Sequence, residues 1–285
     1  MEILEKELLK IIDFALIEDV GDGDHTSLAC VPKSGTGKAR LLVKDKGILA
    51  GVELAKIIFH RVDPNLKIDV LIEDGAYVKH GQIAFYVEGS SLSILTAERL
   101  VLNFMQRMSG IATKTNELAH LIEDLPTKLL DTRKTTPCVR LMEKWAVKIG
   151  GGHNHRFALY DMVMIKDNHV DYAGGIKQAI ERVNAYLKEK NKALKIEIEV
   201  RNIDELNQVL AVGNVDRIML DNFTPQQIIE ALKLIPRDQY ETEASGGINE
   251  KSIRAYAETG VDFISSGALT HSYQSLDLSL KAEFA

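Results

Sequence analysis

The sequence predicts an α/β protein in two parts: an antiparallel α+β region, then a parallel sheet whose preferred closure is a barrel. From about residue 128 onward, short apolar runs alternate with helix-like stretches, which is typical of parallel strands joined by crossover helices. Before residue 90, strand-like runs flank turns at Asp74-Gly75 and His80-Gly81, which favours antiparallel pairing. A long helical stretch over 94–122 lies between the two patterns. Periodicity alone leaves an open doubly wound sheet as the alternative to the barrel.

The N-terminal region begins with a helix, because apolar residues recur at helical spacing over residues 3–15. A polar run over 18–26, rich in Gly and Asp, suits a loop. The remaining expected elements are a pair of strands over 38–52 with a turn at Asp45–Gly47, a helix over 52–62, and strands over 67–72 and 82–88.

In the C-terminal half, continuous apolar runs such as MVMI and RIML fit strands that are buried on both faces. The expected strands are 128–130, 162–165, 195–200, 217–220, 242–244 and 263–265. The expected helices lie near 138–149, 174–190, 203–211, 225–234 and 250–258.

The composition is that of an ordinary globular protein and argues against several functions. Of 285 residues, 45% are hydrophobic and 27% are charged, and the formal net charge is -6. A mildly acidic chain has no general attraction for nucleic acid or anionic membranes, so neither is an expected partner, and a bound anion needs a local cluster of cations. The chain has no dinucleotide fingerprint, P-loop or HExxH motif, which argues against hydride transfer, nucleoside triphosphate hydrolysis and a zinc site.

The cysteines and the N-terminus favour a cytoplasmic location. Cys30 and Cys138 lie too far apart in sequence for a disulfide framework or a zinc motif, so a reducing compartment is expected. The Glu-rich, amphipathic N-terminus lacks the basic start and unbroken apolar run of a signal peptide. No stretch approaches the ~18 apolar residues of a membrane span.

Polar and glycine residues accompany every expected parallel strand. They are DTRKTTP from Asp131, KDNH from Lys166, Glu197 and Glu199 within the strand over 195–200, Asp221-Asn222, SGG from Ser245 and SGA from Ser266. Taken singly, each is an ordinary turn, and KTTP could equally open a helix with Thr136 as its cap and Pro137 in its first turn. Six such segments in register favour a functional rim, because barrel active sites form where the strands end.

Four cations and a histidine are expected on this rim: Arg133, Lys134, Arg156, Lys166 and His155. Clustered cations repel one another, so the cluster predicts an anionic ligand with several charges. Arg suits bidentate capture of a carboxylate or phosphate, and Lys supplies a compact point charge. The glycines of the preceding GGGHNH run allow the backbone to approach a ligand closely, or else mark a flexible loop.

Carboxylates and glycine turns complete the expected rim. Glu199 and Asp221 on adjacent strands indicate recognition of sugar hydroxyls or a magnesium site completed by substrate phosphates, with salt bridges to Lys134 and Lys166 as the structural alternative. Glu197 points the same way as Glu199 in a regular strand. The turns at 245–247 and 267–268 offer N–H groups for a 5′-phosphate. Two anions are therefore expected, a phosphosugar and a carboxylate-rich partner.

The ordered motifs resemble one family. DTRKTTP, GGGHNHR, MIKDNH, EIEV, MLDN, EASGGI and SSGALTHS, with the earlier LIEDVGDGDHTS and AERLVLNFMQRMSGIAT, resemble the quinolinate phosphoribosyltransferases over nearly the whole chain. The resemblance implies an incomplete, seven-stranded α/β barrel, an N-terminal α/β sandwich domain, and a homodimer in which the sandwich domain of one subunit covers the barrel mouth of the other. We therefore expect a sandwich domain at 1–112, completed by 270–285, and a barrel domain at 113–269.

The resemblance also implies roles for individual residues. It assigns quinolinate to Arg133, Lys134, His155, Arg156 and Lys166, with Thr132 in the substrate site and Arg99 reaching in from the partner subunit. It assigns the ribose and magnesium of phosphoribosyl pyrophosphate to Glu199 and Asp221, and the phosphate to Ser245, Gly246, Gly247, Gly267 and Ala268. Lys134, Glu199 and Asp221 are the expected catalytic residues, and Mg²⁺ is expected mainly through substrate phosphates. The chain departs from the family's usual Gly-Leu at Cys138-Val139 and from a frequent Gly at Ala158.

The implied reaction joins quinolinate to phosphoribosyl pyrophosphate and releases pyrophosphate and CO2, giving nicotinate mononucleotide for NAD biosynthesis. Magnesium and basic residues neutralise the departing pyrophosphate, the ring nitrogen attacks an oxocarbenium-like sugar carbon, and the alkylated ring then loses the adjacent carboxylate. The alternatives are a phosphoribosyltransferase for nicotinate or another aromatic acid, and a family member that binds an anion without turnover.

Overall fold

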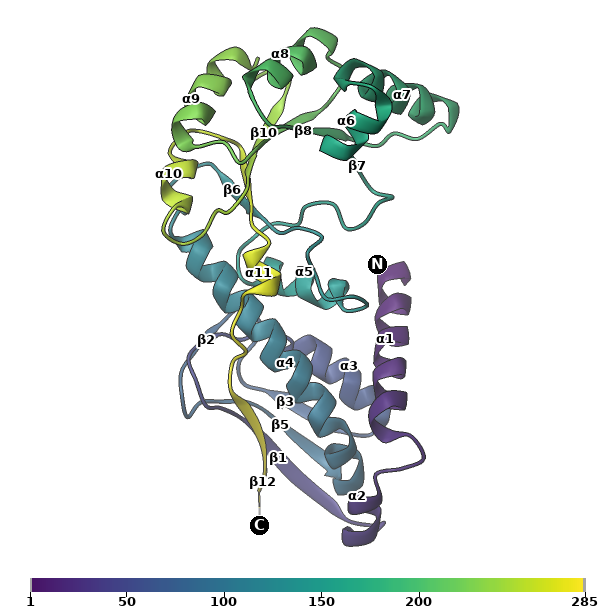
Figure 1. Cartoon of the computed structure of the whole chain (residues 1–285). Helices are drawn as coiled ribbons and strands as arrows, with labels where there is room; N and C mark the ends of the chain where they lie inside the picture. Colours follow the sequence, from purple (N-terminus) through teal and green to yellow (C-terminus); the bar gives the residue numbers. More distant parts are fainter. Residues whose placement is uncertain (1, 284–285) are drawn as a thin grey trace. The chain divides into compact units, whose positions relative to one another are not determined.

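The computed structural model describes residues 2–283, with side chains from residue 6 onward, and divides into two compact units (Figure 1). Unit 1 takes the chain up to Asn116, the segment Thr135–Gly151 and the chain from Leu269 onward. Unit 2 takes Glu117–Lys134 and Gly152–Ala268. Among the described residues, no helix is both long enough and apolar enough to cross a membrane.

Unit 1 is built on an antiparallel sheet of strand order β12-β1-β5-β3 and a two-stranded sheet, β2-β4. The strands are β1 (Thr36–Val43), β2 (Gly47–Ile48), β3 (Lys67–Val70), β4 (Tyr77–Val78), β5 (Ile83–Ser90) and β12 (Leu278–Glu283). The helices are α1 (Glu2–Val20), α2 (His25–Cys30), α3 (Val52–Val62), α4 (Ser91–His120) and α5 (Arg140–Ile149). The end of the chain completes the larger sheet, because β12 pairs with β1 from Lys38 to Val43.

The two strands expected over 38–52 do not pair with each other, so that prediction is wrong. β1 pairs with β5 and β12, whereas β2 pairs with β4. The backbone N–H of Ile48 donates to Oγ1 of Thr113 on α4 at 2.8 Å, and a side chain at Gly47 would collide with the same threonine. The segment after Asp45 therefore lies against α4 and does not fold back onto β1.

The loop expected over 18–26 is largely helical, because α1 continues to Val20 and α2 begins at His25. Asp24 caps α2, with its carboxylate accepting the backbone N–H of Ser27 at 3.0 Å. The Asp and Gly residues that favoured a loop are thus a helix cap and a connection over 21–24.

Unit 2 is a parallel sheet of strand order β6-β11-β10-β9-β8-β7, with helices between successive strands. The strands are β6 (Lys128–Leu130), β7 (Val163–Ile165), β8 (Ile196–Val200), β9 (Arg217–Asp221), β10 (Glu241–Ser245) and β11 (Phe263–Ser265). The helices are α6 (Asp167–Ala173), α7 (Ile176–Glu189), α8 (Ile203–Val212), α9 (Pro225–Leu234) and α10 (Ile253–Ala257). The short helix α11 (Ala268–His271) follows β11 and belongs to unit 1 from Leu269 onward. The described sheet thus has six strands, where the resemblance implied seven, and beside β6 Leu130 makes a single parallel bridge with His153.

The parallel strands alternate between an apolar face and a polar face. Ile196, Ile198, Ile218, Leu220, Ala244 and Ile264 are buried on one face. The opposite face carries Glu197, Glu199, Arg217, Met219, Asp221, Glu243, Ser245 and Ser265, because residues two apart in a strand point the same way. The register places Glu199 beside Met219 and Asp221 beside Ser245, so the polar face is continuous from strand to strand.

The segment 135–151 packs in unit 1, although the expected barrel domain of 113–269 includes it. Glu143 of α5 is fully buried, and its Oε1 lies 2.9 Å from Nε of Arg107 on α4. The backbone N–H of Thr136 donates to the other oxygen of Glu143 at 3.2 Å. This buried ion pair ties α5 to α4. Thr136 is therefore bound to Glu143 and is not the cap of the helix, because α5 begins only at Arg140.

Candidate active site

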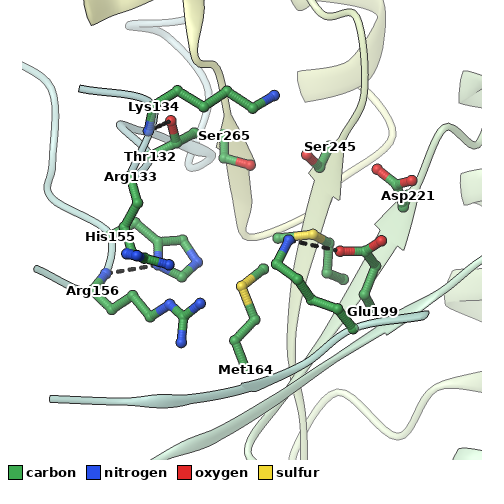
Figure 2. Close-up of a pocket in the computed structure, with 12 residues that line it drawn as sticks. Thr132, Arg133, Lys134, His155, Arg156, Met164, Glu199, Asp221, Ser245 and Ser265 are labelled. Atoms are coloured by element: carbon green, nitrogen blue, oxygen red, sulfur yellow. Dashed lines mark hydrogen bonds and ion pairs between the residues drawn. The ribbon is translucent and has the colours of Figure 1, made fainter. Parts of the chain in front are cut away.

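A cavity of about 380 Å³ opens at the carboxyl ends of the parallel strands of unit 2 (Figure 2). Its lining residues are Thr132, Arg133, Lys134, His155, Arg156, Met164, Lys166, Glu199, Met219, Asp221, Ser245 and Ser265. They come from the segment after β6, the segment after the His153 bridge, and strands β7 to β11 or the residues that follow them. The cations expected on the rim and the two expected carboxylates therefore share one space.

Cations gather on one side of this cavity. Figure 2 shows Arg133, Lys134 and Arg156 on one side and Glu199 and Asp221 on the other. Burial and the neighbouring Arg133 guanidinium lower the pKa of Arg156, because both disfavour its charged form. An anion between the two guanidinium groups would offset this repulsion and restore the solvation that burial removes.

Glu199 and Asp221 face the cavity from the neighbouring strands β8 and β9. Nζ of Lys166 lies 3.3 Å from Oε2 of Glu199, so one of the salt bridges of the structural alternative is present. Burial raises the pKa of both carboxyl groups; for Glu199, Lys166 opposes the rise and Asp221 adds to it. The charged form of a carboxylate with a raised pKa is stabilised by a nearby cation or by hydroxyl donors. Glu199 and Asp221 can therefore bind a ligand in addition to the contact of Glu199 with Lys166.

Three lining residues were not expected from the sequence: Met164, Met219 and Ser265. The two methionines give the cavity an apolar contact surface, and the flexible thioether is well suited to the face or edge of an aromatic ring. A signal for them was present, because Met164 is two residues before Lys166 and Met219 is two residues before Asp221.

Asp131 fixes the two segments that carry the arginines. This fully buried carboxylate accepts the backbone N–H of His155 at 2.8 Å and the side-chain amide of Asn154 at 2.6 Å. Its own backbone N–H donates to the carbonyl of His153 at 3.0 Å. The segment after β6 and the segment 153–156 are thereby held side by side, which brings Arg133 and Arg156 to the same wall.

The ring of His155 is directed at protein groups through both nitrogens. Nδ1 accepts the backbone N–H of Arg156 at 2.7 Å, and Nε2 lies 2.9 Å from Glu197 and 3.4 Å from Glu243. Burial opposes charge on the ring, but the two carboxylates outweigh it and raise the pKa of His155. Glu197 thus lies beneath the cavity lining, together with Glu243, a residue that the sequence reasoning missed.

Five residues of the expected site lie outside the cavity lining: Arg99, Gly246, Gly247, Gly267 and Ala268. Arg99 is an exposed residue of α4 in unit 1. Gly246 follows the lining residue Ser245 with a φ of 105°, and a side chain there would meet the backbone nitrogen of Asn222 at 2.8 Å. Close approach between two strand ends therefore requires this glycine, whatever its part in ligand binding.

Known proteins place this chain in one family. The N-terminal domain of quinolinate phosphoribosyl transferase matches residues 24–109, and the C-terminal domain of the same enzyme matches residues 111–281. The chain is 46% identical to a chloroplastic nicotinate-nucleotide pyrophosphorylase (carboxylating) of Arabidopsis thaliana, over 97% of this chain and 83% of that protein. The structure of the nicotinate-nucleotide pyrophosphorylase from Francisella tularensis is similar with a TM-score of 0.88 and 41% identity, covering 98% of this chain and 96% of the other. NadC from Streptococcus pyogenes is similar with a TM-score of 0.90 and 38% identity, covering 96% and 95%. The chain belongs to the quinolinate phosphoribosyltransferase family.

Proposed function

We propose that this chain transfers the phosphoribosyl group of phosphoribosyl pyrophosphate to quinolinate, with loss of CO2, and so forms nicotinate mononucleotide. The observation that carries the proposal is the division of one cavity into a cationic side and a carboxylate side, in a chain of this family. A pyridine ring with two carboxylates complements the cationic side. A sugar with its hydroxyls and metal-bound phosphates complements the other.

Quinolinate binds on the cationic side. Arg133 and Arg156 each present a planar guanidinium group that can hold one carboxylate by two N–H groups. Lys134 adds a point charge on this side, and Lys166 adds one from its position beside Glu199. Met164 and Met219 then contact the ring itself. Because the ring nitrogen is a weak nucleophile, holding it in line with the sugar carbon supplies the main part of the rate enhancement.

Glu199 and Asp221 bind the ribose and the magnesium of phosphoribosyl pyrophosphate. Mg²⁺ takes oxygen ligands and keeps several waters, so two carboxylates at the cavity wall fit an ion that is otherwise bound by substrate phosphates. The buried trio of His155, Glu197 and Glu243 fits less well, because the Arg217 guanidinium already lies 3.1 Å from Glu243. When bound, the metal offsets the negative charge of the departing pyrophosphate.

The glycine turns at 245–247 and 267–268 take the 5′-phosphate. Gly246 and Gly247 have φ values of 105° and 63°, and a backbone that passes through this region can present successive N–H groups to one anion. Ser245 lines the cavity directly before this turn, and Ser265 lines it two residues before Gly267. Both turns therefore begin at strand ends that line the cavity, at β10 and at β11.

The bonds change in two stages. The bond between the sugar carbon and the pyrophosphate oxygen breaks as the bond to the ring nitrogen forms, and Lys134 stabilises the charge that develops on the pyrophosphate. The ring is then a cation. The bond from the ring to the carboxylate beside the nitrogen breaks, its electron pair stays on the ring carbon next to the positive nitrogen, and a solvent proton takes the place of the CO2.

Product analysis tests this function. We expect one pyrophosphate and one CO2 for each nicotinate mononucleotide formed from quinolinate, phosphoribosyl pyrophosphate and Mg²⁺. Nicotinate has no carboxylate beside its nitrogen, so it cannot yield CO2 by this route. Faster pyrophosphate release with nicotinate than with quinolinate would identify a nicotinate enzyme instead, and no turnover with either would identify an anion-binding protein.

The proposal includes a homodimer in which Arg99 of one subunit binds a quinolinate carboxylate in the cavity of the other. Arg99 is exposed on α4 and therefore accessible to a second chain. A mixture of the Arg99→Ala and Lys134→Ala variants should recover part of the wild-type activity, because one site in a mixed dimer then carries both native residues. Subunit exchange, followed with two affinity tags, without any recovery would show that Arg99 does not act across subunits.

A cytoplasmic location is the last part of the proposal. Cys30 and Cys138 are both exposed and free, and exposed thiols persist in a reducing compartment. Fractionation of the source cells should recover the protein with a cytoplasmic marker enzyme. Recovery in a membrane or organelle fraction would contradict this assignment.

A further inference from the structure

Beneath the cavity lies a cluster of buried charged side chains that make no part of its lining: Glu197, Glu243 and Arg217. Glu197 and Glu243 are fully buried on β8 and β10, and Arg217 lies on β9 between these strands. Nη1 of Arg217 lies 3.1 Å from Oε2 of Glu243, and its Nη2 lies 2.9 Å from Glu241 at the other end of β10. Burying several charges lowers the stability of a protein unless they are paired. A functional role for these residues would explain their position beneath the site.

The cluster meets the active site at His155 and, through Glu243, at Ser265. Nε2 of His155 faces both glutamates, at 2.9 Å from Glu197 and 3.4 Å from Glu243. Its Nδ1 accepts the backbone N–H of Arg156 at 2.7 Å, so in the neutral ring the proton is on Nε2, which faces the glutamates. The ring therefore joins the buried glutamates to the backbone of an arginine in the cavity wall.

Arg156 itself has few other supports. One of its guanidinium nitrogens donates to the carbonyl of Met162 at 3.2 Å, and the residue lies in a segment between the His153 bridge and β7 that has no strand neighbours of its own. Its placement depends on the residues immediately before it. Asp131 fixes the backbone of His155, and the two glutamates fix its ring.

We propose that Glu197 and Glu243, with Arg217 pairing Glu243, are positioning residues for substrate binding: they orient the His155 ring, which in turn holds Arg156 where it meets a carboxylate of the aromatic substrate. The effect on substrate binding rests on the proposed function, whereas the orientation of the ring does not. The sequence pattern agrees, because Glu197 and Glu243 each lie two residues before a lining residue of the same strand face, Glu199 and Ser245.

A metal ion held by His155, Glu197 and Glu243 is the competing use of this cluster, since all three offer ligand atoms within 4.8 Å of one another. The guanidinium of Arg217 argues against it, because a cation already pairs with Glu243 where a metal would add a second positive charge. Metal content of the purified protein separates the two uses.

The test combines imidazole ¹⁵N NMR with steady-state kinetics on the full-length protein. In the wild type without substrate, the His155 signals, assigned by their loss in His155→Asn, should report a proton on Nε2 and none on Nδ1 at a pH above the raised pKa of the ring, about 9. In the Glu197→Gln/Glu243→Gln double variant, this single tautomer should give way to a mixture. The KM for quinolinate should rise about tenfold or more, while the KM for phosphoribosyl pyrophosphate changes less than about twofold.

Glu241→Gln is the matched control, because it also removes a partner of Arg217 but does not face His155. It should leave the tautomer and both KM values unchanged. If the double variant fails to fold, as judged by circular dichroism, the Glu243→Gln single variant should show the same shifts to a smaller degree.

An Nδ1-protonated neutral ring in the wild type, an unchanged tautomer in the glutamine variants, or stoichiometric metal that is lost with Glu197→Gln would each overturn the proposal. A wild type without any turnover would contradict the proposed function alone, because the NMR result still decides whether the glutamates orient the ring.

Discussion

The two sides of the cavity are held in place by different means. On the carboxylate side, Glu199 and Asp221 lie on β8 and β9, which are paired along their length, so backbone hydrogen bonds set their positions. On the cationic side, Arg133 and Arg156 lie in segments without strand pairing, and buried polar side chains set their positions. The side chains of one site can therefore be positioned by strand pairing on one side and by a buried carboxylate, Asp131, on the other.

The largest expected effect is on the cationic side. Arg156→Ala or Lys134→Ala should lower kcat/KM with quinolinate about 10³-fold, because each removes a charge that binds the substrate anion or the leaving group. The melting temperature should stay within a few degrees of the wild type, since both residues face the cavity. Steady-state kinetics with a parallel melting curve checks this, and near-wild-type rates would refute the assignment of the cationic side.

The carboxylate side should respond with a different kinetic pattern. Glu199→Gln should lower kcat about 10²-fold and alter the dependence on Mg²⁺ and phosphoribosyl pyrophosphate. Its equilibrium affinity for quinolinate should change little. Glu230→Gln, an exposed change on α9, is the control for loss of one negative charge. Equal losses of quinolinate and phosphoribosyl pyrophosphate binding in Glu199→Gln would mean that the two sides do not divide the substrates.

The support of the loops can be tested through stability. Asp131→Asn should lower the free energy of unfolding by about 2 kcal/mol, because a buried carboxylate that accepts two hydrogen bonds is replaced by an amide that can accept at only one oxygen. Urea denaturation measures the change. A loss below about 0.5 kcal/mol, within the range of ordinary surface changes, would show that Asp131 is not what holds these loops.

The smallest expected effect concerns Cys138, which has a φ of 68°. An L side chain is disfavoured there, so Cys138→Gly should raise the free energy of unfolding by about 1 kcal/mol. Glycine, the residue that the resemblance led us to expect here, adopts this conformation without strain. Cys30→Gly, in the last turn of α2, is the matched control and should destabilise by about 1 kcal/mol instead. A loss of stability in both variants would contradict this explanation.

The sequence predicted the parallel strands well, because each is a short apolar run followed by a polar segment. It could not reveal partners that are distant in the chain. The sequence predicts that the two strands over 38–52 pair with each other, whereas β2 pairs with β4 and donates a hydrogen bond to Thr113 on α4. Local periodicity also missed α2 and α6, whose short lengths give too few apolar repeats to detect.

For the site, residue types and the family motifs identified the charged groups that line the cavity. The residues beneath this lining could be found only from the alternation and pairing of the strands. Met219 and Glu243 each lie two residues before a polar strand end, and alternation along the strand would have found them. The orientation of His155 could not be predicted in this way, because it depends on Glu197 and Glu243, which lie on two other strands.

We propose that the cationic side of the cavity is built for a ring with two carboxylates. Isothermal titration of the wild-type protein with quinolinate and with nicotinate tests it most directly. The second carboxylate adds a charge-assisted contact, so quinolinate should bind at least about tenfold more tightly. Equal affinity for the two acids, or tighter binding of nicotinate, would contradict this role of the cationic side.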